Sequence, residues 1–171
     1  FYSYMMTQKT VTDYDEAGNM LMTTNRYGYD DYGYIKTIET DDSGGNVRRK
    51  TFSYVHELNV SEPYISMQTL NVSSPVSEET DWIVINGVSK QLACLKNNYL
   101  LKDGLSPWEG FVYTNRVPVV NSVEYSMEGL PLEERAVYPV HDAYGNPVYI
   151  IKENTFHAVY TWNYFGTDTV C

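Results

Sequence analysis

The histidines, whose side chains are suited to acid–base and metal chemistry near neutral pH, are scattered along this 171-residue chain. They are His56, His141 and His157. None stands at the short spacings that build a zinc site. The chain also lacks a Gly-x-Ser-x-Gly nucleophile turn and a glycine-rich phosphate loop. We therefore expect no metal site, no cofactor and no catalytic residue, with the histidines packed on strands or facing solvent.

Acidic residues occur in adjacent pairs that raise the question of a hydrolase. Glycosidases place two carboxylates across a cleft, a distance that sequence alone does not fix. Adjacent acids in β-meanders more commonly solvate turns or protect sheet edges. We therefore expect a protein that is not an enzyme. The pairs are Asp30-Asp31, Asp41-Asp42, Glu78-Glu79 and Glu133-Glu134.

The tryptophans suggest a second kind of chemistry, the stacking of sugar rings on flat aromatic side chains. Trp108 lies next to Pro107 in a predicted loop, and Trp82 and Tyr113 lie on nearby predicted strands. These three residues are the candidates for carbohydrate stacking, although buried aromatic residues in a sheet give the same pattern. Trp162 is expected to be largely buried.

The charge balance argues against nucleic acid as a partner, and the hydropathy argues against a membrane-spanning segment. The chain has 12 Lys and Arg against 22 Asp and Glu, a net charge of −10. Phosphate-backbone binding needs clustered basic residues, so we expect no nucleic-acid binding. No apolar run is long enough to span a membrane. Cys94 is expected to be a buried thiol, and whether it pairs with Cys171 is left open by the sequence.

The composition predicts the elements that carry these residues. The chain has 17 Tyr and few of the Ala and Leu residues that helical proteins use, and Tyr favours strands. Gly, Asn and Asp clusters recur at short intervals, which predicts an all-β antiparallel meander of about ten strands. We expect strands over 1–14, 20–29, 34–40, 47–56, 81–85, 88–101, 111–113, 119–127, 135–140, 147–151 and 156–165.

Two local signals in the middle of the chain are more specific. Asn86-Gly87 between β-prone runs predicts a tight hairpin. Residues 61–70 predict one short helix, with Ser61 as its N-cap, Pro63 in its first turn and apolar residues three apart. Elsewhere Met5, Met6, Met20 and Met22 are expected to fill gaps in the core.

The last predicted strand carries a band of aromatic residues. Side chains of one parity face one side of a sheet, so a continuous strand over 156–165 places five of them together. Such a hairpin needs neighbouring strands to cover its apolar face. The five residues are Phe156, Ala158, Tyr160, Trp162 and Tyr164.

A turn motif repeats in the chain as aromatic-Asp-x-x-Gly-x, with His141 in the aromatic position of the third copy. In each copy the Asp is expected to accept hydrogen bonds from backbone amides, the Gly to supply a positive φ, and the ring to pack on the sheet. The repeat residues are Tyr14, Asp15 and Gly18, Tyr29, Asp30 and Gly33, and Asp142 and Gly145.

These turns resemble the tyrosine–aspartate (YD) repeats of the Rhs family, which occur in bacterial wall-associated proteins, secreted toxins and teneurins. The resemblance is closest to the C-terminal repeat region of Rhs-like proteins from Bacteroides-type bacteria. It is carried by 67–76, by 86–87 with 96–99, and by 144–152 leading to 159–166. It implies a curved sheet of repeated hairpins, and YD repeats are also linked to carbohydrate binding. The chain has too few repeats to close a shell, and its last five residues depart from the strand pattern.

The resemblance implies a non-catalytic structural repeat module of a larger secreted or cell-envelope bacterial protein; the alternative is a carbohydrate-binding module. The implied partners are the remainder of the parent polypeptide, a glycan, and a second copy through edge strands. Because the chain starts in a strand-like segment, we expect it to be a piece of a longer polypeptide. Its expected parts are an N-terminal meander over 1–57, an insertion over 58–140 and a closing hairpin over 141–171, in one continuous domain.

Overall fold

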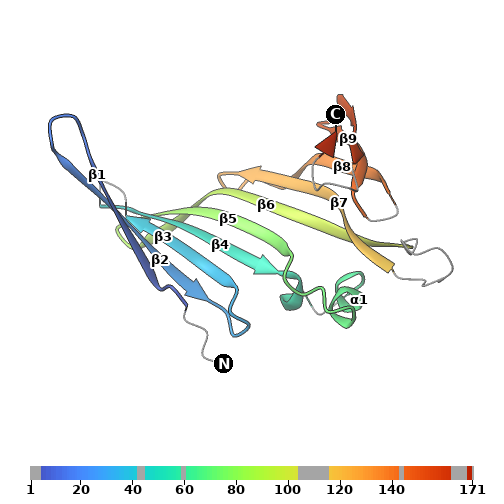
Figure 1. Cartoon of the computed structure of the whole chain (residues 1–171), viewed down its shortest axis with the longest axis horizontal. Helices are drawn as coiled ribbons and strands as arrows, with labels where there is room; N and C mark the ends of the chain where they lie inside the picture. Colours follow the sequence, from blue (N-terminus) through green and yellow to red (C-terminus); the bar gives the residue numbers. More distant parts are fainter. Residues whose placement is uncertain are drawn as a thin grey trace. The chain divides into compact units, whose positions relative to one another are not determined.

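The computed structural model describes residues 5–41, 45–58, 61–103, 116–142, 145–162 and 169–170. Ten strands form one antiparallel meander in which sequence order is also spatial order, from β1 to β10 (Figure 1). The predicted all-β fold with one short α-helix is confirmed. The strands are β1 Gln8–Tyr14, β2 Met20–Tyr29, β3 Ile35–Asp41, β4 Val47–Tyr54, β5 Val76–Ile85, β6 Val88–Asp103, β7 Arg116–Met127, β8 Glu133–His141, β9 Pro147–Lys152 and β10 Phe156–Val159.

Contacts divide the chain into two compact units whose boundaries fall inside β4, β5, β6 and β7. Unit 1 comprises Phe1–Ser53, Glu78–Cys94 and Ser126–Leu130, and unit 2 comprises Tyr54–Ser77, Leu95–Tyr125 and Pro131–Cys171. The predicted partition at 57 and 140 stays a prediction.

Local turn chemistry fixes the hairpin between β5 and β6. Asn86 and Gly87 both have positive φ angles, of 51° and 78°. This is the type I′ geometry whose twist matches that of the flanking strands. The predicted Asn-Gly hairpin is therefore confirmed.

The strand predicted to reach residue 56 ends earlier. β4 stops at Tyr54, and a single 3-10 turn, η1 (Val55–Glu57), follows it. The Val55 amide donates to the Pro75 carbonyl at 3.0 Å, and the Glu57 carboxylate accepts from the Tyr54 amide at 3.2 Å. The Leu58 amide closes the turn by donating to the Val55 carbonyl at 3.0 Å.

The predicted helix exists but begins later than expected. Helix α1 runs over Tyr64–Thr69 with Pro63, not Ser61, as its N-cap. Pro63 already has helical dihedral angles (φ −85°, ψ −2°), and its carbonyl accepts from the Met67 amide at 2.9 Å. The Ser61 side chain lies upstream of this cap, and the cap residue makes no side-chain hydrogen bond.

The predicted strand over 156–165 is broken, so the continuous aromatic band does not form. β10 ends at Val159, Phe156 is exposed, and the next residues form β11 (Thr161–Trp162), which pairs with β12 (Thr169–Val170). Val159, the last paired residue of β10, faces Tyr149, and the Tyr160 amide still donates to the Val148 carbonyl at 2.8 Å before the chain enters β11. β12 also shows that the last residues contribute a short strand. Tyr164 lies outside the described residues.

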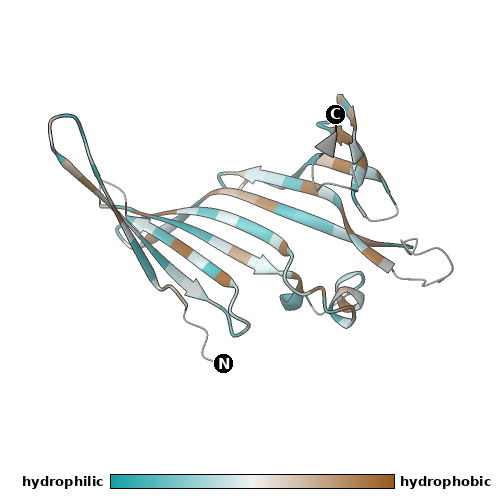
Figure 2. Ribbon diagram, viewed as in Figure 1, coloured by the Kyte–Doolittle hydropathy of each residue, from teal (hydrophilic) through white to brown (hydrophobic). Residues whose placement is uncertain are grey.

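The core is small among the described residues, and most strand positions are only half-buried. Figure 2 shows hydrophobic and hydrophilic residues alternating along the strands. Met67 and Val55, both in unit 2, are fully buried. In the described part of unit 1, Cys94 is the only buried hydrophobic residue, and its sulfur accepts from the Thr80 hydroxyl at 3.7 Å. Cys94 is thus the buried thiol that was predicted; Cys171 lies outside the described residues.

The methionines expected in the core are exposed instead. Met20 and Met22 have exposed fractions of 62% and 60%, and Met5 and Met6 are also exposed. Period-2 alternation predicted which side chains share a face. It did not predict whether another element covers that face.

Candidate functional site

The three repeat turns share one hydrogen-bond arrangement. In the first, a carboxylate oxygen of Asp15 accepts from the Asn19 amide at 2.7 Å, the Asp15 amide donates to the Asn19 carbonyl at 3.0 Å, and Gly18 donates to the Asp15 carbonyl at 2.9 Å. The third turn repeats these bonds between Asp142 and Asn146, with carboxylate-to-amide and amide-to-carbonyl distances of 2.9 Å. In each of these turns the aspartate carboxylate therefore accepts from a backbone amide of the same turn.

The second turn follows the same scheme with Tyr34 in place of the asparagine. A carboxylate oxygen of Asp30 accepts from the amides of Tyr32 and Tyr34, both at 2.9 Å. The Asp30 amide donates to the Tyr34 carbonyl at 3.0 Å. The expected aspartate bonding is confirmed in all three turns.

Electrostatics in the first turn agree with this geometry. The hydrogen bond from the Asn19 side chain, at 2.7 Å, lowers the pKa of Asp15, and the Asn19 backbone amide lowers it further. Hydrogen bonds to the charged form favour that form. The ionised carboxylate is thus the form that holds the turn.

The glycines of the three turns have the same backbone conformation in different surroundings. Their φ angles are +82° at Gly18, +85° at Gly33 and +87° at Gly145. A Cβ atom at Gly18 would meet nothing within 4 Å, whereas one at Gly145 would lie 2.7 Å from Cγ1 of Val117 and 3.1 Å from Cγ1 of Val119. The third turn is packed against β7, and the first projects freely.

The aromatic position of the motif differs among the copies. The Tyr14 ring has an exposed fraction of 69%, contrary to the expectation that each ring packs on the sheet. Nothing described covers the hairpin end on which Tyr14 stands. The Tyr29 hydroxyl donates to the Met6 carbonyl at 2.8 Å, and Nε2 of His141 hydrogen-bonds the Val120 carbonyl at 3.0 Å.

His141 lies at the edge of a depression in unit 2, with a volume of about 360 Å³, that Tyr99 and Tyr138 also line. Burial lowers the pKa of His141. Burial also raises the pKa of Tyr99 to about 12, and the Tyr99 hydroxyl donates to the Val76 carbonyl at 2.8 Å. The Tyr99 hydroxyl and Nε2 of His141 are therefore engaged with backbone carbonyls, whereas Nδ1 of His141 is buried without a hydrogen-bond partner.

A second depression in unit 2 lies beside Arg135 and has a volume of about 540 Å³. Arg135 bridges two carboxylates, with Nη1 3.0 Å from Glu153 Oε1 and Nη2 3.1 Å from Glu133 Oε2. Its charge is compensated within the protein. Arg135 is therefore not free to bind an anionic ligand in this depression, which Lys152 also lines.

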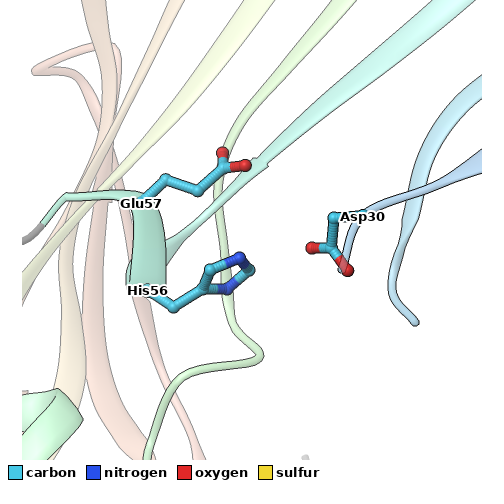
Figure 3. A group of neighbouring side chains, drawn as sticks. All are labelled: Asp30, His56 and Glu57. Atoms are coloured by element: carbon cyan, nitrogen blue, oxygen red, sulfur yellow. The ribbon is translucent and has the colours of Figure 1, made fainter. Parts of the chain in front are cut away.

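The other two histidines also have partners within unit 2. The His56 ring stacks on Tyr54 at a centroid distance of 5.8 Å, and its Nδ1 lies 3.3 Å from the Ser73 carbonyl. His157 stacks on Tyr149 and hydrogen-bonds its hydroxyl. Figure 3 shows His56 and Glu57 projecting from η1, together with Asp30, which belongs to unit 1 and holds its own turn.

Of the three candidate sugar-stacking residues, only Trp82 lies among the described residues. Trp82 is half-buried, and its indole N–H donates to the Thr51 hydroxyl at 3.1 Å. Trp108 and Tyr113 lie outside the described residues. Trp162 is mostly buried, as predicted, and its N–H donates to the Pro147 carbonyl at 2.8 Å. Pro147 is the first residue of β9 and lies beyond Tyr149, where the pairing of β9 with β10 ends.

No family model, curated protein or solved structure matches this chain. Among the residues that the structure describes, no helix is long and apolar enough to cross a membrane.

Proposed function

We propose that this chain is a non-catalytic structural repeat module of a larger secreted or cell-envelope protein of the Rhs/YD-repeat type. The observation that carries the proposal is the shared hydrogen-bond arrangement of the three repeat turns. Asp15, Asp30 and Asp142 direct their carboxylates to amides of their own turns, within six residues of chain. A motif that is repeated and used for backbone bonding each time favours a scaffold over a reactive centre.

The histidines support the same conclusion. General acid–base catalysis needs a titratable group within reach of a substrate. His56, His141 and His157 each engage a carbonyl or a tyrosine of their own unit. Their side chains act as cross-links between neighbouring segments.

The topology suits a module that continues into other parts of a polypeptide. A meander in which every strand pairs with its sequence neighbours ends in two edge strands, here β1 and β10. An edge strand presents backbone donors and acceptors to any strand that adds to it. The remainder of the parent polypeptide is the proposed partner of the module.

The test is to replace the turn aspartates within the parent protein. Alanine at Asp15, Asp30 and Asp142 removes the acceptors, and we expect the amount of parent protein in the secreted or envelope fraction to fall. Asparagine at the same positions keeps one acceptor oxygen and should cause a smaller loss. His157→Gln and Tyr149→Phe, which alter a hydrogen-bonded pair on β10 and β9 without touching a turn, should leave the amount unchanged. An undiminished amount of the alanine variant would contradict the proposal.

A further inference from the structure

Strand β1 is an edge strand whose seven residues are all exposed. It belongs to unit 1, where the described residues include a single buried hydrophobic residue, Cys94. The hairpin that it forms with β2 also exposes large apolar side chains on both faces. These are Val11, Tyr14, Met20, Leu21 and Met22. A strand of this kind is a site of intermolecular pairing unless something blocks it.

The ladder between β1 and β2 fixes which backbone groups of β1 point outward. Asp15 donates to the Asn19 carbonyl at 3.0 Å, and Tyr27 donates to the Thr7 carbonyl at 2.9 Å. Bonded and non-bonded pairs alternate in an antiparallel ladder, so the odd-numbered residues 7–15 bond to β2. The even-numbered residues direct their N–H and C=O groups to the open edge. They are Gln8, Thr10, Thr12 and Tyr14.

The charges of β1 lie on the odd-numbered residues and are symmetric about Val11. Lys9 stands two residues before Val11 and Asp13 two residues after it. Their partners across β2 are Asn25 and Leu21, so neither faces an opposite charge within its own hairpin. A strand that pairs with β1 without placing opposite charges beside Lys9 and Asp13 would therefore bind less favourably.

One strand matches them, and it is β1 itself. Two copies paired antiparallel about Val11 overlap along the whole of Gln8–Tyr14, and each outward-facing residue meets another outward-facing residue. In that register Lys9 of each copy lies opposite Asp13 of the other, in a non-hydrogen-bonded pair, where side chains approach most closely. Shifting the register by two residues separates both ion pairs.

We propose that β1 is a homodimerisation strand that pairs antiparallel with β1 of a second copy, in the register centred on Val11. The contact is isologous, because each copy contributes the same seven residues. It goes beyond the scaffold role, since it assigns the β1 edge to a second copy and leaves the β10 edge to the remainder of the parent polypeptide.

The test is a charge swap followed by sedimentation velocity over a range of concentrations. Lys9→Asp alone places two like-charge pairs in the dimer, and so does Asp13→Lys alone. We expect each variant to dimerise more weakly by roughly tenfold or more. A mixture of the two variants restores both ion pairs, as does the double variant K9D/D13K, and both should dimerise like the unaltered chain. Lys90→Asp, at an exposed position on the interior strand β6, is the control and should have no effect.

Disulfide crosslinking tests the register of the two β1 strands independently of the charge swap. In a Cys171→Ser background, Val11→Cys should form an intermolecular disulfide on oxidation, because two copies of residue 11 face each other. Thr12→Cys, which would face Thr10, should not. A monomeric unaltered chain at high concentration would overturn the proposal, as would a dimer that is insensitive to the swap or crosslinks equally through both cysteines. None of these results bears on the turn aspartates, so the scaffold role would stand or fall separately.

Discussion

Alanine substitutions at the turn glycines separate backbone strain from packing. Gly18 and Gly145 have φ angles of +82° and +87° in turns with the same hydrogen bonds. The left-handed backbone conformation should therefore destabilise an alanine by a similar amount at both sites, about 1–2 kcal/mol. Part of this is offset by about 0.4–1 kcal/mol, because alanine restricts the unfolded chain. We expect Gly18→Ala to cost about 1 kcal/mol in net stability.

Gly145→Ala adds a steric cost that the first turn does not have. Its Cβ would lie 2.7 Å from Val117 Cγ1 and 3.1 Å from Val119 Cγ1. Val119 is buried and has little room to move. Overpacking of this kind typically costs about 1–3 kcal/mol, so the third turn should lose that much more than the first. Gly33→Ala, which meets only the end of the Met5 side chain at 2.9 Å, should fall between them.

The two turns lie in different units, so the assay must report each locally. Hydrogen exchange at the amides of Asn19 and Asn146, which donate to Asp15 and Asp142, gives the opening free energy of each turn. Urea denaturation of each variant gives the global change. Equal losses at Gly18 and Gly145, or a larger loss at Gly18, would refute the reasoning that the third turn is packed against β7.

Three further predictions concern buried and half-buried side chains of unit 2. Met67→Ala removes a fully buried side chain and should cost about 2–5 kcal/mol by urea denaturation; a cost below about 1 kcal/mol would mean that α1 does not seal this core. Burial lowers the folded-state pKa of His141 below that of the unfolded chain. Stability from this group is therefore full above about pH 6.5 and is lost as the pH falls below it. His141→Gln should flatten that part of the stability–pH curve, and an unchanged curve would argue against it. Burial raises the pKa of Tyr99 to about 12, so the ultraviolet difference between the unaltered chain and Tyr99→Phe should lack tyrosinate absorbance at about pH 10; tyrosinate already present there would contradict its burial.

The features that the sequence predicts well depend on few residues. Asn86-Gly87 sets a type I′ turn through its own dihedral angles, and each turn aspartate bonds amides at most four residues away. Such interactions are encoded inside a short window of sequence. For the same reason the strand over Met20–Tyr29 was predicted with its observed bounds.

The features that the sequence did not predict depend on what lies next to a segment in space. Whether Met20 and Met22 are buried depends on an element covering β2, which alternation does not reveal. The 3-10 turn that follows β4 is joined through the Val55 amide to the carbonyl of Pro75, twenty residues along the chain. The break after Val159 accompanies the pairing of Thr161 and Trp162 with β12, a strand that local alternation does not reveal.

The candidate site was predicted unevenly for similar reasons. The role of the aspartates follows from residue type and local spacing. The pairing of β1 with itself has a sequence signal, a lysine and an aspartate symmetric about Val11, but that signal acquires meaning only once β1 is known to be an edge strand.

The central claim is that this chain works as a structural part of a larger secreted or envelope protein. The most direct measurement uses an antibody against the 171-residue chain on fractionated cells and culture medium of its source. The account predicts a polypeptide much longer than 171 residues, located in the envelope or the medium. Detection of the 171-residue chain alone, confined to the cell interior, would contradict it.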